Sequence, residues 1–183
     1  KGLLELSDGA MVVRLDEAGM PPCLIRKSDG ASLYATRDLA CADYRMQELK
    51  GDLNLYVVGV DQTLHFRQVF KVLEKMGRPW VGQCHHIAFG MYRFKDARIS
   101  TRKGNTIFLE DVLLKARELA REIIAKKNPE LPQADLVAKQ VGIGAIVFND
   151  LVNDRVKDVD FDWDRALDFE GDSGPYVQYC GVR

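Results

Sequence analysis

Apolar residues change their spacing along this chain, and the changes mark its elements. Residues 53–58 form a nearly continuous run of β-type side chains, which is typical of a strand buried on both faces of a parallel sheet. A helix is predicted over residues 63–76, where Gly77 and Pro79 stop it, and a second strand over residues 83–89. The order strand, helix, strand predicts a βαβ crossover in an open parallel sheet.

Further elements flank this crossover on both sides. Apolar residues at helical spacing predict a helix over residues 35–49, namely Leu39, Ala42, Met46 and Leu49. The remaining predicted elements are short strands at residues 10–15, 23–26 and 106–108, and helices at residues 110–127, 134–152 and 172–183. An α/β part is therefore expected to give way to an all-helical part near residues 109–115.

Composition bounds the class of protein. With 46% hydrophobic and 29% charged residues, the chain has the balance of a soluble globular protein. A net charge of −1 gives no general attraction for nucleic acid, so any RNA contact must be a local patch or lie elsewhere in a longer protein. The absence of an apolar run of 18 residues predicts no membrane partner, and four scattered cysteines favour reduced thiols and a cytoplasmic location.

Cys84, His85 and His86 stand together and invite interpretation as a metal site. Adjacent residues on a strand point to opposite faces, and no carboxylate or further thiol follows at ligand spacing. We therefore predict no bound metal at these residues.

A basic loop precedes the helical part. It contains three cations, two hydroxyl groups and a glycine, namely Arg98, Arg102, Lys103, Ser100, Thr101 and Gly104. These groups can hold a polyphosphate and offset the charge that develops on departing pyrophosphate. Considered alone, the loop is better explained as a solvated turn between a strand and a helix.

A second cluster follows the buried strand directly. Ligands of open parallel sheets bind outside the carboxyl ends of the strands. There Gly59 would let a nucleotide approach the backbone, Asp61 could bind ribose hydroxyls, and His65 and Gln68 could face the same crevice. The alternative is an ordinary turn, since turns after strands commonly use Gly and Asp.

A third cluster places Tyr34 and Asp38 four residues apart. On a helix both side chains lie on one face, where a phenol beside a carboxylate can clamp a cationic ligand. The alternative is a surface Asp38 that pairs with Arg37 or Arg45.

The combination and order of these clusters make them specific. Tyr-x-Thr-Arg-Asp at residues 34–38 precedes Val-Gly-Val-Asp-Gln at residues 58–62, with His65 and Phe66 after it. Ser-Thr-Arg-Lys-Gly-Asn at residues 100–105 and Gly-Asp-Ser-Gly-Pro-Tyr-Val-Gln-Tyr at residues 171–179 follow. In this order the motifs resemble the arginyl-tRNA synthetases, which are class I aminoacyl-tRNA synthetases. The resemblance extends from about residue 27 to residue 183.

This resemblance implies an activity and a fold. The family activates L-arginine with ATP, accompanied by Mg²⁺, and transfers arginine from arginyl-adenylate to tRNA(Arg); its members are often monomeric. The implied fold class is α/β: the second half of a Rossmann-like parallel-sheet nucleotide-binding domain, followed by an α-helical segment. We expect a connecting β-hairpin segment at residues 1–30, the second half of the catalytic domain at residues 31–112, and a helical segment leading into the anticodon-binding domain at residues 113–183.

The resemblance also implies roles for single residues. The arginine pocket would be lined by Tyr34, Asp38 and Gln62, with Asp38 as the bidentate partner of the guanidinium. The expected ATP-binding residues are Gly59, Asp61 and His65 at the adenosine part, together with Arg98 and Ser100. The expected catalytic residues, which stabilise the transferring phosphates, are Ser100, Thr101, Arg102 and Lys103.

The chain departs from the family pattern in two places. Residues 98–103 correspond to the KMSKS signature, but Arg98 and Thr101 replace its two lysines and Ile99 replaces its methionine. The His-x-Gly-His element that binds ATP is absent, and the first residue is Lys. We therefore expect a fragment of arginine–tRNA ligase that is inactive alone and self-associates through an exposed sheet edge. The alternative is a stand-alone module that senses arginine or a nucleotide without catalysis.

Overall fold

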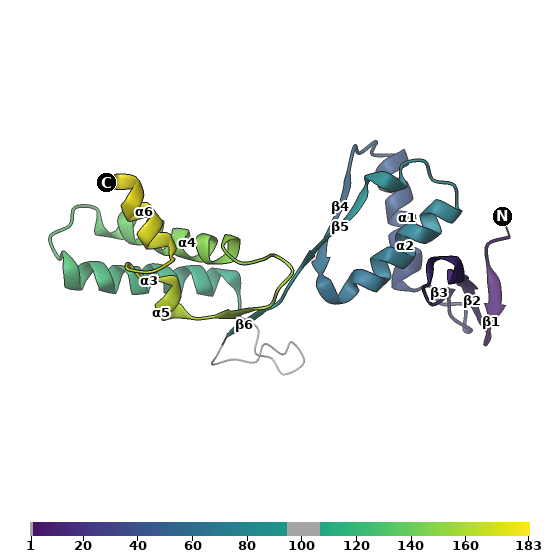
Figure 1. Ribbon diagram of the computed structural model, residues 1–183, viewed down its shortest axis with the longest axis horizontal. Coiled ribbons are helices and arrows are strands. Elements are labelled where there is room, and N and C mark those ends of the chain that lie inside the picture. Colours follow the sequence, from purple (N-terminus) through teal and green to yellow (C-terminus); the bar gives the residue numbers. More distant parts are fainter. Residues whose placement is uncertain (1, 95–106) are drawn as a thin grey trace. The chain divides into compact units, whose positions relative to one another are not determined.

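The computed structural model describes residues 2–94 and 107–183 and divides into two compact units, Lys1–Phe89 and Gly90–Arg183 (Figure 1). The predicted phosphate-binding residues Arg98, Ser100, Thr101, Arg102 and Lys103 lie outside the described residues. No helix in the described ranges has the length and apolar character needed to cross a membrane.

The first unit opens with a small antiparallel sheet in the order β1–β2–β3. Its strands are β1 (Glu5–Ser7), β2 (Ala10–Val13) and β3 (Cys23–Arg26). Between β2 and β3, Gly19 ends a short 3₁₀ turn at φ +63°, a left-handed conformation that glycine adopts at little cost. The two strands predicted in this segment are confirmed, and β1 is an additional strand.

The predicted βαβ crossover is present. Strands β4 (Asn54–Gly59) and β5 (Cys84–Phe89) pair in parallel, from Asn54 opposite Cys84 to Gly59 opposite Phe89. Helix α2 (Thr63–Lys75) connects them, and Gly77 follows it at φ +76°. The α/β class with a parallel sheet is therefore confirmed.

Burial of β4 on both faces was a wrong prediction. Tyr56 is buried against Phe66 and Phe70 of α2, but Leu55 and Val57 on the opposite face are 52% and 65% exposed. Helices α1 (Tyr34–Gln47) and α2 both contact the Tyr56 face, and no described element covers the opposite face. An apolar run predicts a strand but does not predict how many of its faces are covered.

Helix α1 (Tyr34–Gln47) and helix α2 enclose the main core of the first unit with the small sheet. Leu39 and Ala42 of α1 meet Val72 and Leu73 of α2, and Leu15 lies fully buried beside them. Each of the leucine and valine side chains contributes about 1.5–3 kcal/mol when it is fully removed from water. This packing fixes the two helices that carry the candidate site.

The second unit contains a parallel pair of strands that the sequence did not predict. Strands β6 (Tyr92–Phe94) and β7 (Val159–Phe161) are only three residues each. The strand predicted at residues 106–108 is wrong in its described part, because Ile107 and Phe108 lie outside any regular element.

The helices of this unit are α3 (Leu109–Lys127), α4 (Ala134–Leu151), α5 (Trp163–Ala166) and α6 (Gly174–Val182). Small residues let α3 and α4 approach closely, among them Ala116, Ala120 and Gly142. In the last of the four sequence motifs, residues 171–179, the Ser173 side chain caps α6. A Cβ on Gly174 would lie 2.8 Å from the Cα of Ala145 in α4. In the described structure this motif has a packing role.

Candidate functional site

The start of α1 is fixed by Thr36, a residue to which the sequence analysis gave no role. Its hydroxyl accepts a hydrogen bond from the backbone N–H of Leu33 (3.3 Å) and donates one to the carbonyl oxygen of Ile25 in β3. The helix therefore begins at Tyr34, and Asp38 lies one turn later on the same face. The predicted one-face arrangement of these two residues is present.

The end of β4 turns directly into α2. Gly59 is buried, and a Cβ at this position would lie only 2.6 Å from Oδ1 of Asp61. The hydroxyl of Thr63 donates to the carbonyl oxygen of Val60 (2.6 Å), which closes the turn. Asp61 and Gln62 are exposed at this end of the strand, and in the observed rotamer the Asp61 carboxylate lies against the backbone of Gly59.

Helices α1 and α2 are joined at this end by a bond between two predicted site residues. Nε2 of His65 lies 2.7 Å from Oδ2 of Asp38, and their side chains are 24% and 32% exposed. The ring of Phe66 stands edge-on to the imidazole at 5.1 Å. Within the described ranges Asp38 pairs with neither Arg37 nor Arg45, so the surface-pair alternative does not describe it.

Tyr34 and Gln62 flank this bond along the chain. Tyr34 is the first residue of α1 and is 78% exposed, and Gln62 immediately precedes α2. In the described part of the chain, no hydrogen bond holds either side chain. Two polar groups beside a half-buried carboxylate are thus available to a ligand.

Gln68 does not join this group. Its amide nitrogen donates to the carbonyl oxygens of Pro21 (2.8 Å) and Pro22 (3.4 Å). The expectation that Gln68 faces the nucleotide crevice is wrong, because one further turn of α2 directs it to the loop between β2 and β3.

The two histidines of β5 lie outside the Asp38–His65 contact, on opposite faces of the strand. The ring of His86 stacks on Phe66 at 4.7 Å, and its Nε2 lies 3.0 Å from the carbonyl oxygen of Val58. His85, on the opposite face of the strand, is exposed. Among the described residues, no group of three His, Cys, Asp or Glu could hold a metal ion.

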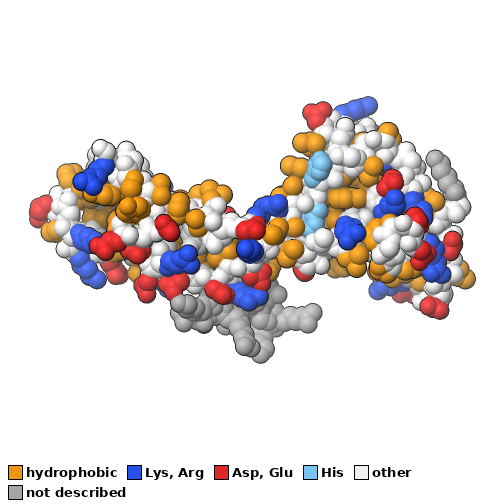
Figure 2. Space-filling view, in the orientation of Figure 1, with side chains coloured by type: hydrophobic (Ala, Val, Ile, Leu, Met, Phe, Trp, Pro, Cys, Tyr) orange, Lys and Arg blue, Asp and Glu red, His pale blue; other side chains and the backbone are white. Residues whose placement is uncertain are grey.

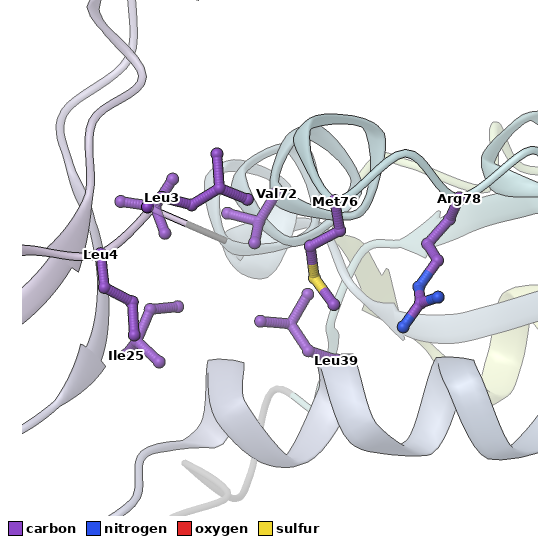
Figure 3. Close-up of a pocket in the computed structure, with 9 residues that line it drawn as sticks. Leu3, Leu4, Ile25, Leu39, Val72, Met76 and Arg78 are labelled. Carbon is purple, nitrogen blue, oxygen red and sulfur yellow. The ribbon is translucent and has the colours of Figure 1, made fainter.

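A hollow of about 460 Å³ in the first unit has a lining that includes none of these site residues (Figure 3). It is lined by aliphatic side chains, including Leu39, Val72 and Met76. Its one charged lining residue, Arg78, donates to Asp43 at 2.6 Å. Asp43 thus pairs one end of this guanidinium, whereas the Nε of Arg78 is buried without a hydrogen-bond partner among the described residues.

The whole chain can be compared with known proteins. Residues 1–163 match the family model described as tRNA synthetases class I (R), catalytic domain. The chain belongs to the class I arginyl-tRNA synthetase family. The resemblance inferred from the four motifs is therefore confirmed.

Relatives and solved structures of arginyl-tRNA synthetases agree with this assignment. The chain is 52% identical over 183 residues to the arginine–tRNA ligase of Clostridium kluyveri. The matched region covers all of this chain and 32% of the relative. It is 55% identical over 181 residues to arginine–tRNA ligase 1 of Bacillus thuringiensis subsp. konkukian, again with 32% of the relative covered. The chain thus spans about a third of the length of these curated relatives.

Among solved structures, the arginyl-tRNA synthetase of Thermus thermophilus superposes with a TM-score of 0.83 at 25% identity, over all of this chain and 37% of that one. The enzyme of Plasmodium falciparum gives a TM-score of 0.79 at 23% identity, over 99% of this chain and 32% of that one, which supports the fold.

Proposed function

We propose that this chain carries the amino-acid-binding and adenosine-binding part of an arginine–tRNA ligase. The full enzyme would join L-arginine to ATP as arginyl-adenylate, release pyrophosphate and transfer the arginyl group to tRNA(Arg). Relatives named arginine–tRNA ligase match the chain from end to end, which does not favour a stand-alone sensing module. The four cysteines are unpaired, in keeping with a cytoplasmic location.

The observation that carries the proposal is the half-exposed carboxylate of Asp38 between the first turns of α1 and α2. One of its oxygens is bound by His65, and the other has no partner among the described residues. A guanidinium is a planar fork that matches a carboxylate bidentately, so arginine is the amino acid that this group suits best. Tyr34 and Gln62 would add hydrogen bonds around the side chain and reject shorter or neutral ones.

The nucleotide would lie at the carboxyl end of β4. Gly59 permits close approach to the backbone, and Asp61 offers a carboxylate to ribose hydroxyls. Following the family motif, Arg98 and Ser100 would bind ATP, and Ser100, Thr101, Arg102 and Lys103 would stabilise the transferring phosphates. Mg²⁺ would enter with those phosphates, whose oxygens are its usual ligands in nucleotide sites.

The domain division predicted above remains part of the proposal: a connecting segment at residues 1–30, catalytic residues at 31–112 and a helical segment from residue 113. We also propose that the chain on its own self-associates. The uncovered face of β4 and β5 exposes Leu55, Val57 and Phe89, and Figure 2 shows hydrophobic side chains on the surface over these strands.

The arginine pocket is tested by Asp38→Asn in the full-length enzyme, with arginine-dependent exchange of pyrophosphate into ATP as the assay. Asn keeps the shape and its amide oxygen can still accept the His65 hydrogen bond, but the change removes the negative charge and replaces the second acceptor oxygen by an N–H donor that cannot pair with a guanidinium. We expect the KM for arginine to rise about a hundred-fold or more, while the KM for ATP changes little.

Asp43→Asn is the matched control. Asp43 lies on the same helix with 26% of its side chain exposed, but it pairs with Arg78 beside the aliphatic hollow. We expect this variant to keep the arginine KM of the unaltered enzyme. Equal effects of Asp38→Asn on arginine and ATP, or equal effects of the two Asn variants, would contradict the pocket assignment.

A further inference from the structure

Asp38 and His65 were expected to serve different ligands, arginine and adenosine, yet they bind each other. The 2.7 Å separation and the partial burial of both side chains make this a directed contact between α1 and α2. We infer that His65 is a positioning residue of the amino-acid pocket: it holds the Asp38 carboxylate in the orientation in which the substrate guanidinium meets it. This inference rests on the function proposed above.

Both ends of the contact are carried on packed helices. His65 lies in the first turn of α2, next to Phe66, which is 4% exposed and packs on Tyr56. Asp38 is followed on α1 by Leu39, which belongs to the same core cluster as Val72 of α2. An aspartate that is held by a group on a rigid element loses less freedom when the ligand binds, so the carboxylate is preorganised.

The contact leaves the carboxylate able to bind arginine. Two carboxylate oxygens offer about four lone-pair sites, and His65 uses one of them on Oδ2. Oδ1 is unpartnered in the described ranges, and Oδ2 can accept a second hydrogen bond. A guanidinium can therefore bind both oxygens while the Nε2–H of His65 remains in place, so His65 assists the substrate instead of competing with it.

Two substitutions separate the hydrogen bond from the packing of the ring. His65→Phe keeps an aromatic ring against Phe66 but has no donor, whereas His65→Gln loses the ring but keeps an N–H donor at a similar reach. Both are made in the full-length enzyme and assayed by pyrophosphate exchange. His85→Ala is the control, because His85 is exposed on β5 and its side chain makes no hydrogen bond to Asp38, Tyr34 or Gln62 among the described residues.

For His65→Phe we expect the arginine KM to rise about ten-fold or more, as for the loss of a hydrogen bond to a charged group, with kcat and the ATP KM within about two-fold. His65→Gln should restore most of the arginine affinity, and His85→Ala should behave as the unaltered enzyme. In an Asp38→Asn background His65→Phe should cost clearly less, because its effect passes through the Asp38 charge.

Two results would overturn the inference. Equal arginine KM values for the Phe and Gln variants would show that the donor is not required. A rise in the ATP KM as large as that for arginine would return His65 to the adenosine site. Failure of the proposed function is a different result, namely an unaltered full-length enzyme without arginine-dependent exchange.

Discussion

The closest approach between helices in the second unit depends on one glycine, and Gly142→Ala tests it. A Cβ at Gly142 would lie 2.7 Å from the carbonyl carbon and oxygen of Ala116 and 2.8 Å from the backbone nitrogen of Arg117. Ordinary contacts begin near 3.4 Å, and backbone atoms cannot rotate away. Helices α3 and α4 must therefore separate by roughly 0.7 Å at this contact, where Ala116 is fully buried.

The cost follows from two opposing terms. Overpacking of a well-packed interface lowers the free energy of unfolding by about 1–3 kcal/mol. Replacing Gly by Ala within a helix raises it by about 0.5–1 kcal/mol, because Ala loses less backbone entropy on folding. We expect Gly142→Ala to lower the free energy of unfolding of this unit by about 0–2.5 kcal/mol, and to be about 1–3 kcal/mol less stable than a helical Gly→Ala change without overpacking. Gly144→Ala, two residues along the same helix, is the control: its Cβ would meet only the flexible end of the Gln178 side chain, at 2.5 Å. That variant should be neutral or slightly stabilised.

Urea unfolding followed by tryptophan fluorescence measures the difference. Trp163 packs against the buried cluster of the second unit, while Trp80 belongs to the first, so a Trp80→Phe background lets Trp163 report alone. The reasoning is refuted if Gly142→Ala unfolds at the same urea concentration as Gly144→Ala, since the two changes differ mainly in what the new methyl group meets.

Two further predictions concern the first unit. Burial raises the pKa of Tyr56 to about 12 from its ordinary value near 10. Between these pH values the folded state keeps a proton that the unfolded chain releases, so the free energy of unfolding falls as the pH rises from about 10 to about 12. Tyr56→Phe should lower the free energy of unfolding by about 1 kcal/mol at neutral pH, because the Asn54 amide loses its acceptor. Between pH 10 and 12 the variant should lose less of its free energy of unfolding than the unaltered chain. Urea titrations at several pH values measure this, and an equal loss for both proteins would contradict the prediction. Val57→Lys should reduce self-association of the isolated chain, measured by sedimentation velocity, because it places a charge on the exposed face of β4. Val182→Lys is the control, at a position on α6 that is 89% exposed, and should leave self-association unchanged. Equal association of the two variants would show that the contact lies elsewhere.

The local elements of the first unit could be predicted because each has a signal within its own residues. The apolar run of β4, the glycine after α2 and the strand character of β5 placed the crossover to within one or two residues. Strands β6 and β7 carry no such signal. They are three residues long and pair segments far apart in the chain, through Tyr92 opposite Val159. Their existence depends on tertiary packing, which periodicity does not report.

The candidate site was predictable as a set of residues but not as a set of contacts. Tyr34 and Asp38 share a helix face by spacing alone, and Gly59 and Asp61 follow from the position of a turn after an apolar strand. The Asp38–His65 bond depends on how α1 lies against α2, which no spacing within one helix determines. Thr36 was missed for a similar reason, since its hydroxyl binds the carbonyl oxygen of Ile25 in a different element.

Two independent constraints bring this site together. Residues 59–65 are placed by the direction of β4, because a parallel strand must deliver its carboxyl end to the same edge as its neighbour β5. Asp38 is placed by the start of α1, which Thr36 ties to β3. A shift of the sequence by one residue along α1 would rotate Asp38 by about 100° around the helix axis and away from His65. The threonine of the Tyr-x-Thr-Arg-Asp motif thus sets the register of the helix, and the aspartate supplies the charge that this register aims at the ligand.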